Sequence, residues 1–212
     1  MTVYGQGLYE VGAGAVPAPR GAPAEEALVR RPRGLEFTEG DLVVVSGLPG
    51  SGKSTLIRRT VRAARRIDSQ DVRERWERRM PGFLAYAGYR PLVRAAHYGG
   101  LWRALRSGRS VVVHDCGTQR WVRRWLARTA RRRGRALHLL LLDVPPEVAL
   151  SGQAERGRTV SAYAFGRHRK AVDRLLAEAE AGRLPAGCGS AVLLDREAAG
   201  ELEEISFGGP GG

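Results

Sequence analysis

One eight-residue segment constrains this 212-residue chain more than any other, and its sequence is Gly47-Leu-Pro-Gly-Ser-Gly-Lys-Ser54. It fits the pattern G-x-x-x-x-G-K-[ST] and stands between a β-branched run at 41–46 and a predicted helix from Lys53 to about Arg66. Glycines let the backbone turn tightly and direct its N–H groups at phosphate oxygens, and a helix N-terminus adds a favourable potential for an anion. The segment therefore predicts a loop that wraps a phosphate chain at the end of a strand.

The side chains that follow these glycines are expected to hold a triphosphate and its metal. Lys53 would reach the β- and γ-phosphates as a point charge, and Ser54 would give its hydroxyl to Mg²⁺. Only one other lysine, Lys170, occurs in the sequence, so composition alone would not supply a lysine here. ATP and Mg²⁺ are the expected cofactors. The expected cofactor-binding residues are Gly47, Leu48, Pro49, Gly50, Ser51, Gly52, Lys53, Ser54 and Thr55.

Acidic residues follow two other predicted strands. Asp115 ends the apolar run that begins at Val111, which is where a metal-binding carboxylate is expected; the alternative is that it only caps the following helix. Asp68 follows the strand that contains Ile67. Both acids would lie at the carboxyl edge of the sheet, where ligands bind in open α/β folds.

Short apolar runs alternate with helical patterns along the sequence, which indicates a parallel sheet covered on both faces. The predicted strands lie at 41–46, near 67, and at 110–114, 136–142 and 190–194. The predicted helices lie at 53–66, 71–79, 89–106, 121–133, from 145 onward, at 163–181 and in a short acidic segment that reaches about 204. We therefore predict an α/β protein of the P-loop NTPase fold, with a five-stranded parallel sheet, helices on both faces and a small lid around 155–162.

The chain ends differ from this pattern. Residues 1–34 are rich in Gly, Ala and Pro and predict a flexible tail, 35–206 predict the folded domain, and 207–212 predict a second flexible tail. The longest apolar run, 136–142, is far shorter than the roughly 20 residues that cross a bilayer. No secretory signal is recognised, and two cysteines cannot make a disulfide scaffold. These features predict a cytoplasmic protein with no membrane contact.

The sequence is strongly basic, with 35 Lys+Arg against 22 Asp+Glu and a formal net charge of +13. Such a charge describes either a solvated basic surface or an affinity for phosphates, including nucleic acid. The predicted helix at 119–133 carries seven arginines, which either form a solvated outer face or track an RNA or DNA backbone. They are Arg120, Arg123, Arg124, Arg128, Arg131, Arg132 and Arg133.

Aromatic residues gather between the second and third predicted strands. They either pack in the core or stack on a base or ring. They are Trp76, Phe83, Tyr86, Tyr89, Tyr98 and Trp102.

Four segments together resemble the polynucleotide kinase branch of P-loop phosphotransferases, which is close to the zeta-toxin kinases. The first is the loop at 47–54, and the second is Asp68-Ser-Gln-Asp-Val-Arg73, which is similar to the family's acidic D-x-x-R segment. The third is Val112-Val-His-Asp115 and the polar turn after it. The fourth is Asp143-Val-Pro-Pro-Glu147 with Arg156-Gly157 downstream. The resemblance covers about residues 41–195.

This resemblance implies roles for four residues besides the loop. Arg73 would bind the acceptor through a phosphate or a similar anion, and Asp115 would sit near the acceptor or the metal. Arg156 would be the lid arginine that stabilises the transferring phosphoryl group, with Arg158 as a neighbouring alternative. Asp68 would act as the base or bind a metal-bound water.

The sequence departs from the family at one position. The family's general base in the D-x-x-R segment falls on Gln70, and an amide cannot accept the proton. Asp68 is therefore the candidate base, and transfer that relies on positioning and metal alone is the alternative.

The function implied is ATP-dependent transfer of the γ-phosphate to a hydroxyl acceptor, with Lys53, Asp68 and Arg156 as catalytic residues. The acceptor would be a small molecule or a nucleic-acid 5′-hydroxyl. ATP is favoured over GTP because no guanine-reading Asn/Thr-Lys-x-Asp element is found. Two alternatives stay open: a nucleotide-binding switch without transfer, and a basic RNA-binding protein.

Overall fold

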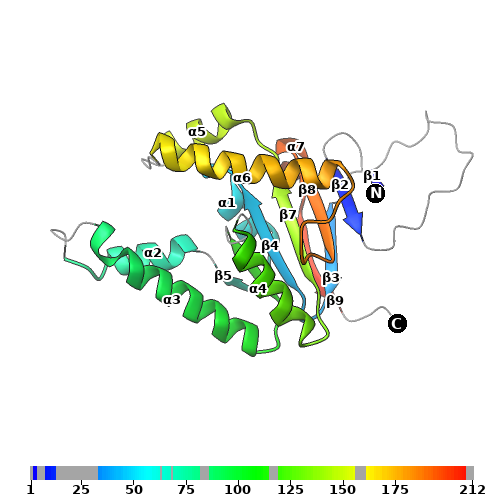
Figure 1. Ribbon diagram of the computed structural model, residues 1–212, viewed down its shortest axis with the longest axis horizontal. Helices are drawn as coiled ribbons and strands as arrows, with labels where there is room; N and C mark the ends of the chain where they lie inside the picture. Colours follow the sequence, from blue (N-terminus) through cyan, green and yellow to red (C-terminus); the bar gives the residue numbers. More distant parts are fainter. Residues whose placement is uncertain are drawn as a thin grey trace, which may run out of the picture.

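The structure, a computed structural model, describes residues 2–3, 8–12, 33–62, 64–67, 69–81, 86–114, 119–155 and 161–208. A large sheet crosses the centre of the molecule (Figure 1). Its strands are β1 (Thr2–Val3), β2 (Leu8–Gly12), β4 (Leu42–Gly47), β5 (Arg65–Ile67), β6 (Val111–His114), β7 (Leu137–Leu142) and β8 (Ser190–Leu194). They lie in the order β1-β2-β8-β7-β4-β6-β5.

The five strands from β8 to β5 are parallel. Every residue of β4, β6 and β8 is buried, so these strands show no alternation of apolar and polar residues. Continuous apolar strands are typical of a sheet that is covered on both faces. The predicted α/β fold with a five-stranded parallel sheet is therefore confirmed. The predicted lid falls largely on residues 156–160, outside the described part of the chain.

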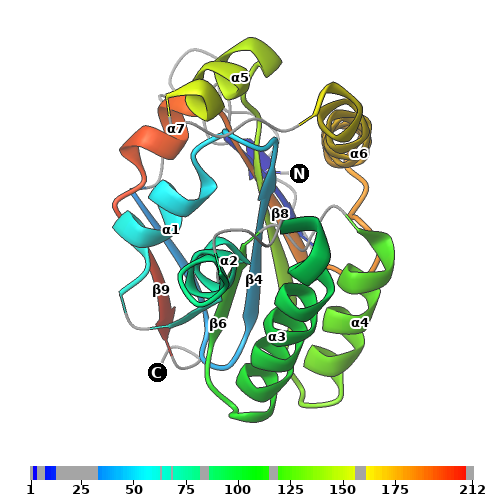
Figure 2. The same ribbon diagram turned by 90° about the vertical axis from the view of Figure 1, so that its left-hand side faces the viewer.

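Helices cover both faces of this sheet (Figure 2). They are α1 (Lys53–Thr60), α2 (Ser69–Glu77), α3 (Tyr86–Arg106), α4 (Arg120–Arg131), α5 (Pro146–Ala154), α6 (Ala162–Glu180) and α7 (Arg196–Glu201). Residues of α3, α4 and α6, among them Leu101, Leu126 and Leu175, share one core, whereas α1 and α7 pack in another around Leu56 and Ala198. Each leucine buried this way contributes about 2 kcal/mol to stability. None of the described helices is long and apolar enough to cross a membrane.

A second, two-stranded parallel sheet was not predicted. β3 (Gly34–Thr38) pairs with β9 (Glu204–Gly208), and the rings of Phe37 and Phe207 lie 5.9 Å apart between their centroids. The predicted C-terminal tail is therefore wrong for Phe207 and Gly208, because both pair with β3.

The predicted length of the first helix is also corrected. α1 ends at Thr60, Val61 is extended and bridges to Ile205, and Arg66 belongs to β5 rather than to the helix. The residues after Thr60 favour a helix locally, but pairing with β9 and β6 determines their conformation.

The N-terminal segment differs from the predicted flexible tail at two places. β2 pairs antiparallel with β8, and β1 pairs antiparallel with β2. An edge strand such as β8 offers a row of backbone hydrogen-bonding groups, and adding a strand satisfies them. The Gly/Ala/Pro-rich stretch at 13–32 lies outside the described residues, as do 209–212.

Arg123 corrects the prediction that the arginines of α4 form a solvated face. Its side chain is only 2% exposed, whereas Arg120, Arg124 and Arg128 are exposed. Burial lowers the pKa of the Arg123 guanidinium, and the nearby Cys188 and Glu178 oppose that shift. Burial likewise raises the pKa of the Cys188 thiol to about 11. Arg123 follows the buried Val122, so it lies at the border of the face that α4 turns toward the sheet.

Asp41 joins three strands at the start of β4. Its Oδ1 accepts a hydrogen bond from the backbone N–H of Ala136 at 2.8 Å, and its Oδ2 lies 3.0 Å from Nε2 of His138. The other ring nitrogen of His138 lies 2.8 Å from the hydroxyl of Ser190, which begins β8. Because Asp41 is only 4% exposed, its loss would leave buried polar groups without partners.

We expect Asp41→Ala to lower the free energy of unfolding by about 2 to 3 kcal/mol, as measured by urea denaturation. Asp41→Asn keeps an acceptor for the N–H of Ala136, so its free energy of unfolding should fall by less than that of Asp41→Ala. Glu39→Ala is the control, since Glu39 is exposed, and should change stability by no more than about 0.5 kcal/mol. Equal losses in Asp41→Ala and Glu39→Ala would show that the network does not stabilise the sheet.

Candidate active site

The loop at 47–54 joins the carboxyl end of β4 to α1. Gly50 and Gly52 both have φ of 89°, a conformation that side chains rarely adopt. A Cβ at Gly50 would also strike the backbone carbonyl of Ala149 on α5. Glycine is therefore needed at these positions for the turn and for the close approach of α5.

Lys53 lies across the loop and is only 4% exposed. Its Nζ donates hydrogen bonds to the carbonyl oxygens of Gly47, at 2.9 Å, and Leu48, at 2.6 Å. Burying an ammonium is costly unless it is hydrogen-bonded, and these carbonyls supply part of that compensation. The arrangement holds a positive charge beside the concave backbone of the loop.

The N-terminus of α1 suits an anion. Gly52 stands at the N-cap and offers no side-chain cap, and no acidic residue lies in the first turn. The hydroxyl of Ser51 is buried and has no hydrogen-bond partner among the residues that the structure describes. A buried polar group in this condition is unfavourable, and a phosphate oxygen would satisfy it. Ser54 is buried and Thr55 is exposed on the first turn of α1. The residues at the start of this helix therefore fit a bound phosphate group.

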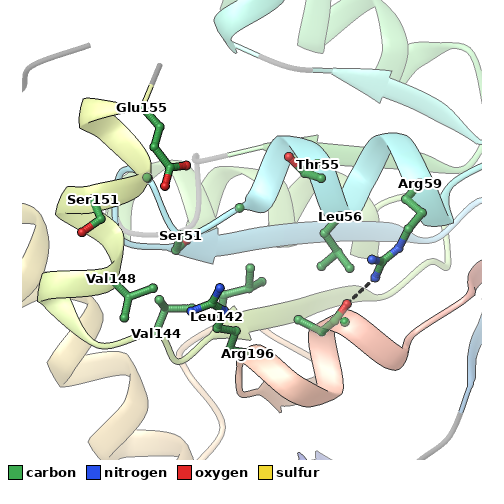
Figure 3. A pocket seen from close by; sticks show the side chains of 15 residues that line it. Ser51, Thr55, Leu56, Arg59, Leu142, Val144, Val148, Ser151, Glu155 and Arg196 are labelled. Atoms are coloured by element: carbon green, nitrogen blue, oxygen red, sulfur yellow. Dashed lines mark hydrogen bonds between the residues drawn. The ribbon is translucent and has the colours of Figure 1, made fainter. Parts of the chain in front are cut away.

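A pocket of about 560 Å³ adjoins the loop (Figure 3). Thr55, Leu56 and Arg59 of α1 line it, together with Ser151 and Glu155 from the α5 side and residues of α7. Leu142 and Val144 add apolar surface from the end of β7. A pocket with apolar walls and a few charged groups suits a planar heterocycle whose phosphates would extend into the loop.

Arg59 connects two walls of this pocket (Figure 3). Its Nη2 donates to the carbonyl oxygen of Ala199, and also to that of Leu202 at 3.1 Å. Because both acceptors belong to the end of α7, this side chain fixes the distance between α1 and α7. Arg196, at the start of α7, lines the same pocket.

Sequence reasoning missed the contact between the loop and α5. A Cβ on Gly152 would lie 2.7 Å from the carbonyl oxygen of Gly50, so only glycine permits the present spacing. Gln153, only 7% exposed, donates its side-chain amide to the carbonyl oxygen of Pro49 at 3.0 Å. A glycine inside a helix was the available signal, because its cost in helix propensity usually has a packing reason.

Several predicted site residues lie outside the described residues, namely Asp68, Asp115 and Arg156. The strands that precede Asp68 and Asp115 are described, and they end at Ile67 (β5) and His114 (β6). In the sheet, Ile67 pairs with Val113, and His114 pairs with Val45 of β4. These strand ends lie at the same edge of the sheet as Gly47. The roles of the three residues therefore stay predictions.

Arg73, the predicted acceptor-binding residue, lies exposed on α2, and the side chain of Gln70 on the same helix is outside the described residues. The Nε of Arg73 lies 2.6 Å from an Oε1 of Glu77, one turn later. An acceptor anion would compete with this exposed ion pair, which is weak by nature.

A second cavity, of about 370 Å³, lies behind the loop and is acidic. Asp143, Asp173 and Asp195 line it, and partial burial together with the other two carboxylates raises the pKa of Asp143. Asp195 is also the N-cap of α7, where its Oδ1 accepts a hydrogen bond from the N–H of Ala198 at 2.7 Å. In the described part of the chain, no three acidic, histidine or cysteine side chains converge on a possible metal site.

The strand order, the glycine loop and the buried lysine define a P-loop kinase-like domain. A protein-family model described as an AAA domain matches residues 42–181, and the chain belongs to this family. The predicted resemblance to P-loop kinases is thereby confirmed at the level of family and fold. No curated protein matches the sequence.

One of the similar solved structures has a TM-score above 0.5 and supports this fold. A chain from the structure of the Pnkp1/Rnl/Hen1 RNA repair complex is 18% identical with a TM-score of 0.53, over 67% of this chain and 47% of that one. This protein thus spans about half of that neighbour's length. The PezAT toxin-antitoxin system of Streptococcus pneumoniae matches at 16% identity and TM-score 0.45, over 58% and 54% of the two chains. A gluconokinase from Sinorhizobium meliloti 1021 matches at 16% identity and TM-score 0.37, over 83% and 86%.

We expect Gly152→Ala to weaken MgATP binding about ten-fold or more, as measured by calorimetry, because the added methyl would push α5 away from Gly50. Gly166→Ala is the matched control: Gly166 lies within α6, where a Cβ would meet no atom within 4 Å. This control should keep its MgATP affinity and gain about 0.5 to 1 kcal/mol of stability. If the two variants bind MgATP alike, the contact between α5 and the loop has no role in binding.

Proposed function

We propose that this protein transfers the γ-phosphoryl group of MgATP to a hydroxyl group of an acceptor. The observation that carries the proposal is the buried Lys53 ammonium, held beside a glycine loop at the N-terminus of α1 and next to a pocket large enough for a base. Charge stabilisation of this kind is the main contribution that proteins make to phosphoryl transfer.

Each part of the site has a task in this reaction. The backbone N–H groups of the loop bind the β-phosphate, and Lys53 offsets the charge that develops between the β- and γ-phosphates. The hydroxyl of Ser54 and the carboxylate of Asp115 would hold Mg²⁺, which neutralises phosphate charge when bound. Arg156 would approach the γ-phosphate from the α5 side. The pocket between α1, α5 and α7 receives the adenine ring.

The acceptor side of the reaction requires positioning more than basicity. Gln70 stands where the family has a general base, so Asp68 is proposed to take the proton or to orient a metal-bound water. Arg73 is proposed to bind an anionic group of the acceptor, exchanging its contact with Glu77 for that group. Acceptors with a phosphate near the reacting hydroxyl, such as a nucleic-acid 5′-end or a phosphorylated small molecule, fit this arrangement. Such a reaction belongs in the cytoplasm, where ATP is available.

A nucleotide-binding switch without transfer is the second candidate, and the amide at Gln70 favours it. Both candidates need MgATP in the loop, and they differ only in turnover. A switch would bind MgATP and change its contacts without passing phosphate to any acceptor.

We expect label from γ-labelled ATP to pass to an acceptor in a panel of 5′-hydroxyl oligonucleotides, sugars and nucleosides. Lys53→Ala should lower the rate about a hundred-fold or more, because the variant loses the charge beside the loop. Lys170→Ala is the control, since Lys170 is exposed on α6 and is the only other lysine. This control should keep the full rate.

Three results would decide between the candidates. Transfer that survives Lys53→Ala would contradict the proposed site. Tight MgATP binding without transfer to any acceptor would support the switch. Absence of MgATP binding in calorimetry would contradict both.

A further inference from the structure

One part of the chain carries many arginines and no acidic residue. Residues 86–114 and 119–135 contain thirteen arginines and no aspartate or glutamate. Because the whole chain has a net charge of +13, the remainder of the sequence is neutral overall. Other arginine-rich parts of the sequence have acidic residues among their arginines, whereas α3, α4 and the residues beside them have none.

These two helices lie side by side on one face of the sheet (Figure 2). Their arginines point mostly to solvent, and the exposed ones include Arg103, Arg106, Arg120, Arg124 and Arg128. Arg123 is the buried exception. We call the exposed surface of α3 and α4 the basic face. With no carboxylate in either helix to offset them, these charges attract a polyanion.

Aromatic rings lie among the arginines of the basic face. Trp102 is 50% exposed and Trp121 is 59% exposed, although large apolar side chains are usually buried. The guanidinium of Arg106 lies 4.6 Å from the centroid of the Trp102 ring. Tyr98 connects the helices, with its ring centroid 5.6 Å from that of Trp121 and 6.4 Å from that of Trp125.

We propose that the basic face binds single-stranded nucleic acid, with its phosphates on the arginines and its bases stacked on Trp102 and Trp121. Unpaired bases stack on aromatic side chains whatever their identity, and arginines along the same surface follow the backbone. A DNA duplex hides its base faces, so it would use the arginines but not the tryptophans.

A lipid surface fits the same residues less well. Membrane-surface helices insert a continuous apolar face, but the apolar residues of α4, namely Val122, Leu126 and Ala130, are fully buried against the sheet. Trp121 alone would insert from this helix. The binding of nucleic acid is separate from the proposed phosphoryl transfer, because no residue of the loop takes part in it.

The test is fluorescence anisotropy with a twenty-nucleotide oligouridine RNA that carries fluorescein at its 3′-end, titrated with the full chain at low and physiological salt. Trp102→Ala/Trp121→Ala should weaken binding about ten-fold or more, and Trp102→Phe/Trp121→Phe should keep most of it because a phenyl ring also stacks. Circular dichroism melting checks that each variant is folded. Lys53→Ala should bind the RNA with the affinity of the native chain, even if its rate of phosphoryl transfer falls.

A charge-matched pair separates the basic face from net charge. Arg124→Glu/Arg128→Glu should weaken RNA binding at least about ten-fold more than Arg58→Glu/Arg62→Glu, which alters the same net charge at exposed positions on and just beyond α1. Single-stranded DNA should bind like the RNA, and duplex DNA and phosphatidylserine vesicles should bind at least about ten-fold more weakly. The proposal would be overturned if the two arginine-to-glutamate pairs lost equal RNA affinity. Native RNA affinity in Trp102→Ala/Trp121→Ala would also overturn it, as would duplex DNA or vesicles that bind as tightly as the RNA.

Discussion

The site depends on a buried ammonium that is compensated by backbone carbonyls. Lys53 donates to the carbonyls of Gly47 and Leu48, the first two residues of its own loop, and so closes the loop on itself. A cation of this kind is costly to bury, and the cost is accepted where an anion will later share the space. The parallel sheet serves this arrangement, because β4 presents Gly47 at an edge where neighbouring strands also end.

The loop is supported from outside as well as from within. Gly152 allows α5 to approach the backbone of Gly50, and Gln153 adds a hydrogen bond to Pro49. On the other side of the pocket, Arg59 ties α1 to the end of α7. The pocket and the loop at 47–54 therefore share α5 as a support, and a displacement of α5 would reach both. In the proposed function, binding energy from a base in this pocket would in this way contribute to the position of the phosphates.

The sequence was informative where a residue's environment follows from its neighbours along the chain. The continuous apolar runs of β4 and β8 predicted a covered parallel sheet, and the glycine pattern predicted the loop. The sequence was uninformative where segments distant along the chain determine a residue's conformation or burial. Val61 leaves the helix because Ile205 pairs with it, and the polar side chains of Arg123 and Gln153 are buried only because the surrounding helices enclose them. No local pattern records such contacts, although a glycine within a helix, here Gly152, was a signal of close packing that could have been used.

The uneven distribution of charge has a consequence for how the molecule moves toward its partners. Because α3 and α4 carry arginines and no carboxylate, the side of the sheet that they cover presents a positive surface to solvent. In the field of a phosphate polymer such a surface is attracted before contact, which favours encounters in which these two helices lead. Orientation ahead of collision raises the fraction of productive encounters, and added salt shortens the range over which it acts.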